Sequence, residues 1–430
     1  MTAPRVAILG AGWAGMAAAV ELVDRGADVT VFEAARTLGG RARRVTLDGL
    51  PLDNGLHLLL GAYRDTLATI TRVADGATLF LRAPLRLEST SGFRLTCPSL
   101  PAPLHLVAGL LTARGLTVRD RLAAVRLMAD AQRRDFRLTT PTTVTGHLDR
   151  LRQPAGIRDA LWHPLCLAAL NTPPNVADAQ VLLNVLRDGL ARERADSDLV
   201  FPAVDLSAMF PEPAARFVER RGGRVLTGNA VRTISQAGTG FVVHAATGDH
   251  ACDHVVCAVD PARAPALLAG LPALASIVEA IERMAHAPIV SVYLDHGPDV
   301  VLAGPMIGVD GGPAEWVFDR GALCGQRGWI GAVISAADRW IGVPHATLVD
   351  DVQRQLARAL GLPPAARRTH VITEKRATFL CTPGLARPAP RTPLRGFHLA
   401  GDYTASDYPA TLEAAVRSGL ACARAILENP

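Results

Sequence analysis

The sequence predicts an α/β protein in which two domains alternate along one chain. Its 430 residues exceed what a single hydrophobic core usually holds, and a composition of 49% hydrophobic and 20% charged residues is typical of a packed globular protein. Glycine-rich strand and helix patterns occur near both ends of the chain, so we expect the ends to meet in one domain. We expect this first domain to comprise residues 1–80, 200–270 and 390–430. A second, α+β domain is expected from residues 81–199, which are helical in pattern, and 271–389, which are strand-rich.

The N-terminal residues have the pattern of a βαβ unit. Residues 5–9 form a short apolar run, a glycine-rich turn and a small-residue helix follow, and residues 28–32 form a second apolar run. In the turn, Gly10 permits a sharp change of direction, and Gly12 lets the backbone approach a phosphate closely. Gly15 lets the helix pack closely on the sheet. This order of elements predicts a Rossmann-type dinucleotide site.

The residues beside this turn are expected to complete the dinucleotide site. Trp13 and Ala14 open the helix, whose free N–H groups and partial positive charge suit a diphosphate. Glu33 ends the second strand, where its carboxylate can accept hydrogen bonds from ribose hydroxyls, and Ala34 follows it. A glycine-rich turn also occurs in ordinary βαβ units, but here strand, glycines, helix, strand and acid stand in the required order.

A second glycine pair identifies the dinucleotide. Gly39, Gly40 and Arg41 follow the second strand in AARTLGGRARR, which resembles the extended FAD signature of the amine oxidase and phytoene desaturase superfamily. The glycine pair lets the main chain pass near the pyrophosphate, and the arginine fork can hold a phosphate. The alternative is a plain turn with a surface arginine. The resemblance implies FAD as the cofactor, a Rossmann-type FAD-binding first domain and a substrate-binding second domain interleaved with it.

The C-terminal region resembles the closing motif of the same superfamily. Residues 397–402 (FHLAGD) are expected to form a strand that brings Gly401 and Asp402 to the cofactor. Thr411 and Leu412 are expected to begin a helix whose free N–H groups face the flavin, where negative charge develops on reduction. A bare strand–loop–helix is the alternative.

Four longer stretches narrow the resemblance to one family. They resemble the squalene-associated FAD-dependent desaturases, now understood as hydroxysqualene dehydroxylases, and they are DNGLHLLLGAYRDT (53–66), PLCLAALNTPP (164–174), FPAVDLSAMFPEPAARF (201–217) and AGDYTASDYPATLEAAVRSGL (400–420). The resemblance implies that Gly55, Leu56, His57 and the backbone of Val231 also contact FAD. Leu56 departs from the pattern, because a polar residue is expected there.

The family resemblance implies a reductive reaction on a long isoprenoid. Hydroxysqualene would lose its hydroxyl to give squalene in bacterial squalene and hopanoid biosynthesis, with hydride passing from FADH2 to an allylic cation. Such a site must be dry and must supply one proton. The candidates for protonating or orienting the hydroxyl are His57, Asp407 and Tyr408, although His57 can equally be a satisfied histidine beside the flavin. Tyr63 and Asp402 are weaker candidates.

Other functions remain open from the sequence. A carotenoid-type desaturase shares the cofactor and the substrate class, and a non-catalytic flavoprotein is a different kind of alternative. An amine oxidase is less favoured, because the only lysine, Lys375, lies in a strand before the closing motif. Covalent flavin attachment at Cys381 is disfavoured, because free cysteines usually behave as small buried hydrophobic residues.

Composition limits the partners. The net charge of +5 comes from scattered arginines without an arginine tract interleaved with aromatic residues, which argues against nucleic-acid binding. None of the seven cysteines forms a CxxC pair, and no histidine cluster stands beside them at metal spacing, so no metal site is expected. Their odd number and irregular spacing fit buried thiols in a reducing compartment. A single dinucleotide fingerprint implies an external electron donor. Without a signal peptide or a long apolar run, a cytoplasmic location is expected.

Contact with the membrane surface is a further hypothesis. Residues 98–116 are apolar and proline-flanked, and they precede an expected helix over residues 119–137 with Leu122, Val125 and Met128 on one side and arginines elsewhere. This region could lie on the inner face of a bilayer and admit an insoluble substrate. It could also form a cap buried within the second domain, which is the more common fate of an apolar stripe at helical spacing.

Overall fold

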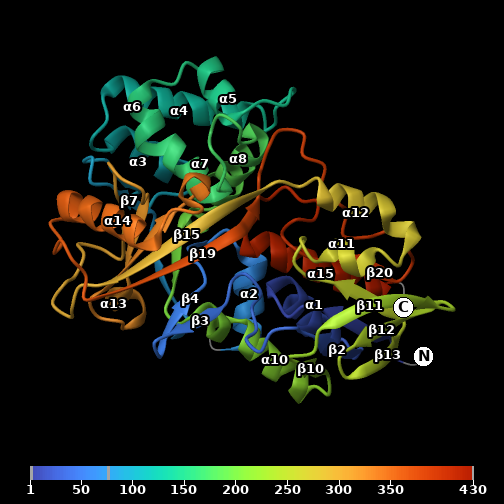
Figure 1. The fold of residues 1–430 in the computed structure, drawn as a ribbon. Coiled ribbons are helices and arrows are strands. Elements are labelled where there is room, and N and C mark those ends of the chain that lie inside the picture. Colours follow the sequence, from blue (N-terminus) through green and yellow to red (C-terminus); the bar gives the residue numbers. More distant parts are fainter. Residues whose placement is uncertain (1–2, 75–77, 429–430) are drawn as a thin grey trace.

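The computed structural model describes residues 3–74 and 78–428, and a parallel sheet organises one half of it (Figure 1). The five strands lie in the order β10-β2-β1-β14-β20, and each neighbouring pair is parallel. Their bounds are β1 Arg5–Leu9, β2 Asp28–Phe32, β10 Arg224–Leu226, β14 His254–Cys257 and β20 Phe397–Leu399. All five fall within the ranges expected for the first domain. The domain boundaries themselves stay a prediction.

Close helix packing covers this sheet. Its central strands are buried along almost their whole length, as expected of parallel strands with both faces covered. Helix α1 (Trp13–Asp24) lies against α10 (Pro211–Arg220) and α15 (Leu412–Glu428). The approach of α15 to α1 requires a glycine, because a Cβ on Gly419 would stand 2.1 Å from the carbonyl oxygen of Ala14. The two ends of the chain are thereby packed together.

An antiparallel extension and two helices complete this half. The three-stranded sheet comprises β11 (Val231–Ala237), β12 (Gly240–Ala245) and β13 (Gly248–Cys252). Helices α11 (Ala264–Leu268) and α12 (Ala275–Glu282) follow β14. Figure 1 shows these elements beside the two termini.

The other half contains a second five-stranded sheet, which is antiparallel. Its order is β16-β17-β18-β15-β19. The strand bounds are β15 His286–Asp295, β16 Met306–Gly308, β17 Trp316–Asp319, β18 Trp329–Ile334 and β19 Arg368–Phe379. Helix α14 (His345–Leu360) packs on this sheet and shares a hydrophobic core with it. A short helix, α13 (Arg320–Cys324), connects β17 to β18.

A group of helices forms the part of this half that lies away from the two termini (Figure 1). They are α3 (Leu104–Thr112), α4 (Val118–Arg133), α5 (Val144–Arg150), α6 (Ala155–Ile157), α7 (His163–Leu170) and α8 (Ala179–Leu186), with π-helical turns at Arg158–Trp162 and Arg187–Ala191. Strands β7 (Arg86–Glu88) and β8 (Arg94–Thr96) pair with each other and contact β16 and α3 respectively. The other short elements are α2 (Arg64–Val73), α9 (Leu206–Met209), β3 (Arg44–Leu47), β4 (Leu50–Asp53), β5 (Leu59–Leu60), β6 (Phe80–Ala83) and β9 (Leu199–Pro202).

Two sequence expectations differ from the structure in detail. The helix expected over residues 119–137 ends at Arg133, and the chain then turns through Asp135 and Phe136, whose φ angles are +48° and +55°. Its expected apolar stripe is split, because Leu122 is 46% exposed whereas Met128 is buried. The strand expected over residues 397–402 ends at Leu399, before Gly401 adopts a φ of +152°.

No helix in the described ranges is long and apolar enough to cross a bilayer. All seven cysteines are free thiols, and five of them are buried.

Candidate functional site

A cavity of about 1770 Å³ is lined by both halves of the protein. Pockets for drug-sized ligands usually measure roughly 300–1,000 Å³, so this one has room for more than one ligand. Almost all residues expected at the cofactor lie on its wall: Gly10, Gly12, Trp13, Ala14, Glu33, Ala34, Gly39, Gly40, Arg41, Gly55, Leu56, His57, Val231, Gly401, Asp402, Thr411 and Leu412. The exception is Gly15. The structure thus brings together segments that are far apart in the sequence, while each residue's contact with FAD stays a prediction.

The start of α1 fits a diphosphate. No side chain caps this helix end, and its first turn carries no acidic residue, so the N–H groups there are free to face an anion. Gly10 turns the chain at φ +101°, and the Cα of Gly40 stands 3.8 Å from where a Cβ on Gly12 would lie. A Cβ on Gly15 would lie 2.0 Å from the carbonyl oxygen of Gly10, so its role is close packing.

The carboxylate of Glu33, just after β2, is hydrogen-bonded to the backbone of the glycine-rich turn. One carboxylate oxygen of Glu33 accepts a hydrogen bond from the backbone N–H of Ala11 at 2.7 Å, and the other accepts from Ala35 at 2.8 Å. Each carboxylate oxygen can accept a second bond, so both remain able to receive ribose hydroxyls. This arrangement fits the adenosine end of FAD.

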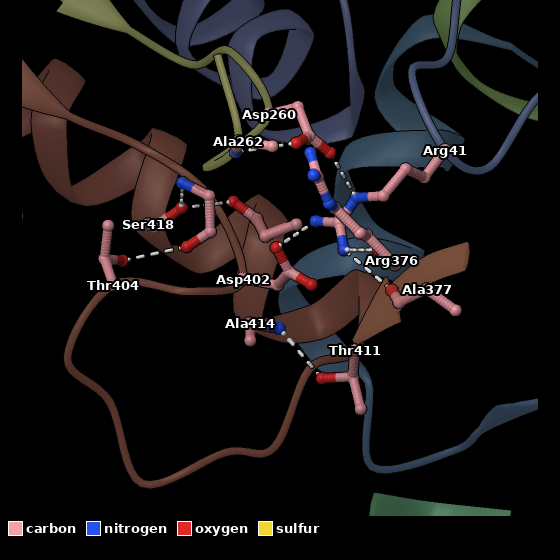
Figure 2. Close-up of polar contacts among 12 residues, drawn as sticks. Arg41, Asp260, Ala262, Arg376, Ala377, Asp402, Thr404, Thr411, Ala414 and Ser418 are labelled. Carbon is pink, nitrogen blue, oxygen red and sulfur yellow. Dashed lines mark hydrogen bonds and ion pairs between the residues drawn. The ribbon is translucent and has the colours of Figure 1, made fainter. Parts of the chain in front are cut away.

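Arg41 connects four distant segments of the site (Figure 2). Its guanidinium pairs with Asp402, lies 3.4 Å from Asp260 and donates to the carbonyl oxygen of Ala377 at 2.7 Å. Burial opposes the charged form, but the two carboxylates outweigh it and raise the pKa of Arg41. Protein groups therefore occupy most of the fork, and the expected contact of Arg41 with phosphate stays a prediction.

The loop before α15 is held by hydrogen bonds from the side chains of Arg387 and Asn184. The Nη1 of Arg387 donates to the carbonyl oxygen of Tyr408 at 3.0 Å, and its Nη2 donates to that of Ser406. The side chain of Asn184 donates to the carbonyl oxygen of Asp407 at 3.0 Å. Sequence reasoning missed Arg387, because it stands in a proline-rich connector that carries no motif.

Thr411 begins the last helix as a cap. Its hydroxyl accepts a hydrogen bond from the N–H of Ala414 at 3.1 Å (Figure 2), and α15 starts at Leu412. This satisfies one free N–H group and leaves others near the cavity. The geometry agrees with a helix start that faces the cofactor.

The structure separates the three expected acid–base residues. The Nδ1 of His57 lies 2.7 Å from the carbonyl oxygen of Gly55, so Nδ1 carries the proton and Nε2 is an acceptor. Burial lowers the pKa of His57, and the charge of Arg41 adds to this effect. A neutral His57 is suited to accept a hydrogen bond and poorly suited to donate a proton.

Tyr408 lies on the cavity wall, whereas the Asp407 side chain is absent from the described lining residues. The carboxylate of Asp407 is largely exposed, 3.6 Å from Arg187. The hydroxyl of Tyr408 interacts with the carboxyl of the buried Asp188, another wall residue. Burial and the charge of Asp188 raise the pKa of Tyr408 to about 12, so this hydroxyl keeps its proton at neutral pH.

A carboxyl that sequence reasoning missed also lines the cavity. Glu315 stands just before β17, and its side chain accepts a hydrogen bond from the N–H of Ser335 at 2.8 Å. Burial raises its pKa to about 7, against the lowering effects of the Ser335 N–H and the Arg339 charge. A substantial fraction of Glu315 is therefore protonated at neutral pH. No sequence motif marks it, because its environment exists only in the folded protein.

Polar groups on β19 form another part of the wall. The amide of Asn54 donates to the carboxylate of Glu374 at 3.0 Å and to the carbonyl oxygen of Arg41 at 3.1 Å. Lys375, the next residue, also lines the cavity. The position of this lysine in the sequence disfavoured an amine oxidase, yet the fold brings it to the cavity.

The remaining wall is mainly apolar. Side chains from the helical region contribute most of it, among them Leu106, Leu110, Met128, Trp162, Val185 and Leu186. Cys381 is buried and does not belong to the described lining, and burial raises the pKa of its thiol to about 12. Within residues 3–74 and 78–428, no group of three or more histidine, cysteine or acidic side chains is arranged to hold a metal ion.

Comparisons with known proteins agree with this geometry. The chain is 30% identical to a hydroxysqualene dehydroxylase of Rhodopseudomonas palustris, over 98% of both chains. It is 25% identical to a 15-cis-phytoene desaturase of an Oncidium hybrid cultivar, over 99% of this chain and 78% of the relative. A putative protoporphyrinogen oxidase from Exiguobacterium sp. 255-15 shares the fold, with a TM-score of 0.72 at 15% identity over the full length of both chains. Residues 13–427 match the family model for flavin containing amine oxidoreductases. With its mixed helices and sheets and its dinucleotide cavity, the chain belongs to this family and is an FAD-dependent oxidoreductase.

Proposed function

We propose that this enzyme removes the hydroxyl of hydroxysqualene reductively and forms squalene, a step of bacterial squalene and hopanoid biosynthesis. FAD, when bound and reduced, supplies the hydride that replaces the hydroxyl. The cavity carries the proposal, because it is large enough for a second ligand beside a dinucleotide and its further wall is apolar. The similarity to a hydroxysqualene dehydroxylase over the whole chain supports the same substrate.

The apolar wall has a chemical task in this proposal. Protonation of an allylic hydroxyl lets it leave as water, and the allylic cation left behind would be trapped by any other water nearby. Leu106, Leu110 and Trp162 exclude water from that part of the cavity and fit isoprene units. Among the polar groups on the cavity wall are Glu315 and Tyr408, which are candidates to contact the departing hydroxyl.

Glu315 is the proton donor that the geometry favours. It faces the cavity and is substantially protonated at neutral pH, whereas His57 is a hydrogen-bond acceptor there. Tyr408, paired with Asp188, is the second candidate and can orient the hydroxyl. Asp407 is disfavoured as the donor, because its carboxylate is largely exposed and lies outside the described cavity wall.

The test is anaerobic. The bound flavin is reduced with dithionite, hydroxysqualene is added, and flavin absorbance is followed together with the product by mass spectrometry. We expect the flavin to reoxidise with stoichiometric formation of squalene. A flavin that stays reduced would refute the proposal.

A carotenoid-type desaturase is the second candidate, and the similarity to a phytoene desaturase over most of this chain favours it. Oxidised enzyme supplied with phytoene or squalene would then introduce double bonds.

In the proposed direction the enzyme needs an external reductant, because the sequence contains a single dinucleotide fingerprint. Reduction of the flavin by NAD(P)H alone, without a partner protein, would contradict the need for a separate carrier.

A further inference from the structure

Exposed apolar side chains gather on helices α3 and α4 and on the segment just before α3. Eight large hydrophobic side chains are exposed in the described ranges, and five of them lie between residues 100 and 122: Leu100, Leu104, Leu111, Val118 and Leu122, at 41%, 55%, 42%, 68% and 46% exposure. Leu104 and Leu111 lie two turns apart on α3, and Val118 and Leu122 lie one turn apart on α4, so each pair shares a helix face. These five residues are called the apolar face below.

The buried sides of the same helices reach the cavity. Leu106 and Leu110 of α3 and Met128 of α4 are buried and line it. Helices α3 and α4 pack against each other, and Arg121 donates to the carbonyl oxygen of Leu111 at 3.3 Å. The helix pair is therefore the layer between the apolar cavity and the apolar face.

A basic pocket adjoins the apolar face. It measures about 320 Å³ and is lined by Arg86, Arg94, Thr96, Thr112 and Arg114. Thr112 directly follows Leu111, so the pocket lies at the end of α3. Such a pocket, with three guanidinium groups and two hydroxyls, suits a phosphate group.

One acid partly offsets this charge. Glu88 lies 2.7 Å from Arg86 and 2.6 Å from Arg94. Arg114 makes no ion pair with any other residue that the structure describes, so the pocket keeps a net positive charge. On α4, the exposed Arg119 and Arg126 lie on the same side as Leu122, one turn before and one turn after it.

We propose that the apolar face and the basic pocket form a docking surface for a bilayer of anionic phospholipid. The exposed leucine and valine side chains would enter the acyl boundary, and the arginines would bind lipid phosphates. Helices α3 and α4 and strand β7 lie at the end of the molecule opposite the two termini (Figure 1), which leaves that end free to approach a membrane. The proposal rests on the proposed function only in that the docked lipid phase would also deliver the isoprenoid substrate.

Co-sedimentation with vesicles tests the surface. The FAD-loaded full-length protein is mixed with vesicles of phosphatidylcholine alone or of phosphatidylcholine with phosphatidylglycerol. We expect binding to the anionic vesicles that weakens with added salt. Val118→Asp should weaken that binding by about tenfold or more, because a charge replaces an inserted apolar group. Arg114→Gln should weaken it about fivefold, the loss expected for one arginine near an anionic surface.

Val301→Asp is the matched control. Val301 is 69% exposed, almost the same as Val118, and lies outside the apolar face. It should bind vesicles as the unaltered protein does. Equal binding by the two aspartate variants, or no binding by the unaltered protein, would overturn the proposal.

Two further readouts exclude other occupants. Release of the protein from vesicles by millimolar inorganic phosphate at constant ionic strength would identify the pocket as a site for free anions and overturn the lipid proposal. A dimer that Val118→Asp converts to a monomer, without any vesicle binding, would identify a second copy as the occupant.

Turnover of detergent-solubilised hydroxysqualene should be the same in Val118→Asp as in the unaltered protein. If neither protein turns over hydroxysqualene while the unaltered protein still binds vesicles, the proposed function is refuted and the docking surface is not.

Discussion

Replacing Glu315 with glutamine removes a titrating group from the cavity and should change how stability depends on pH. The carboxyl has a pKa of about 7 in the folded protein and an ordinary value of 4.5. The folded state therefore holds this proton more tightly than the unfolded state. The stability that Glu315 contributes is fully present below pH 4.5 and is lost as the pH rises to about 7.

The size of the effect follows from the pKa difference. At 1.36 kcal/mol per pKa unit, the loss across this window is about 3 kcal/mol. An unfolding entropy of roughly 2.1 cal/mol/K per residue makes this a Tm change of about 3–4 °C for a chain of 430 residues that unfolds as one unit. Glutamine keeps the hydrogen bond from the Ser335 N–H without titrating.

The assay compares Tm for the unaltered protein and Glu315→Gln from pH 4.5 to 8. We expect the difference between them to shift in favour of the variant by those few degrees as the pH rises. Single-turnover reoxidation of the reduced flavin should lose its pH dependence near 7 in the variant and fall about 100-fold or more in rate. Parallel Tm curves would refute the burial argument, and an unchanged reoxidation rate would refute the role of Glu315 as proton donor.

Three other changes test the site. Gly419→Val should reduce the Tm and the flavin content, because the new side chain collides with α1. The control Gly304→Ala should alter neither, because no atom lies closer than 4.0 Å to its added Cβ. Equal flavin content in the two variants would contradict the packing argument. Glu33→Ala should weaken FAD binding about tenfold, because the ribose hydroxyls lose their hydrogen bonds to the charged carboxylate. Titration of the apoprotein with FAD measures the affinity, and an unaltered affinity would count against the ribose contact. Tyr408→Phe should slow flavin reoxidation while Asp407→Asn leaves it unchanged, and the reverse pattern would restore Asp407 as the acid–base residue.

The parallel sheet and the cofactor wall were largely predictable from the sequence. Strands such as 5–9 and 28–32 are short apolar runs buried on both faces, and their bounds agree with the structure. The glycines of the first turn are constrained by local geometry, so their pattern is visible without the fold. Strand 397–402 was predicted too long, because the pattern does not show where Gly401 turns the chain out of the sheet.

The acid–base groups of the cavity were much harder to predict. Glu315 and Asp188 belong to no motif, and their chemistry depends on burial and on partners distant in the sequence. Asp407 and Tyr408 are neighbours in the closing motif, yet the fold turns one toward solvent and the other toward the cavity. The faces of α4 were also misjudged, since the periodicity of Leu122 and Met128 does not reveal which side another helix covers.

The contacts of Arg41 have a consequence for how the protein is made. Its partners are residues 260, 377 and 402, and α15, one of the two helices that pack on α1, is the last helix that the structure describes. A nascent chain on the ribosome therefore has its glycine-rich turn long before the groups that close the pocket around it. We therefore expect the flavin to be captured only after α15 has emerged from the exit tunnel. A ribosome-stalled chain that ends before residue 397 should show no flavin fluorescence quenching, although most of its sequence is already translated.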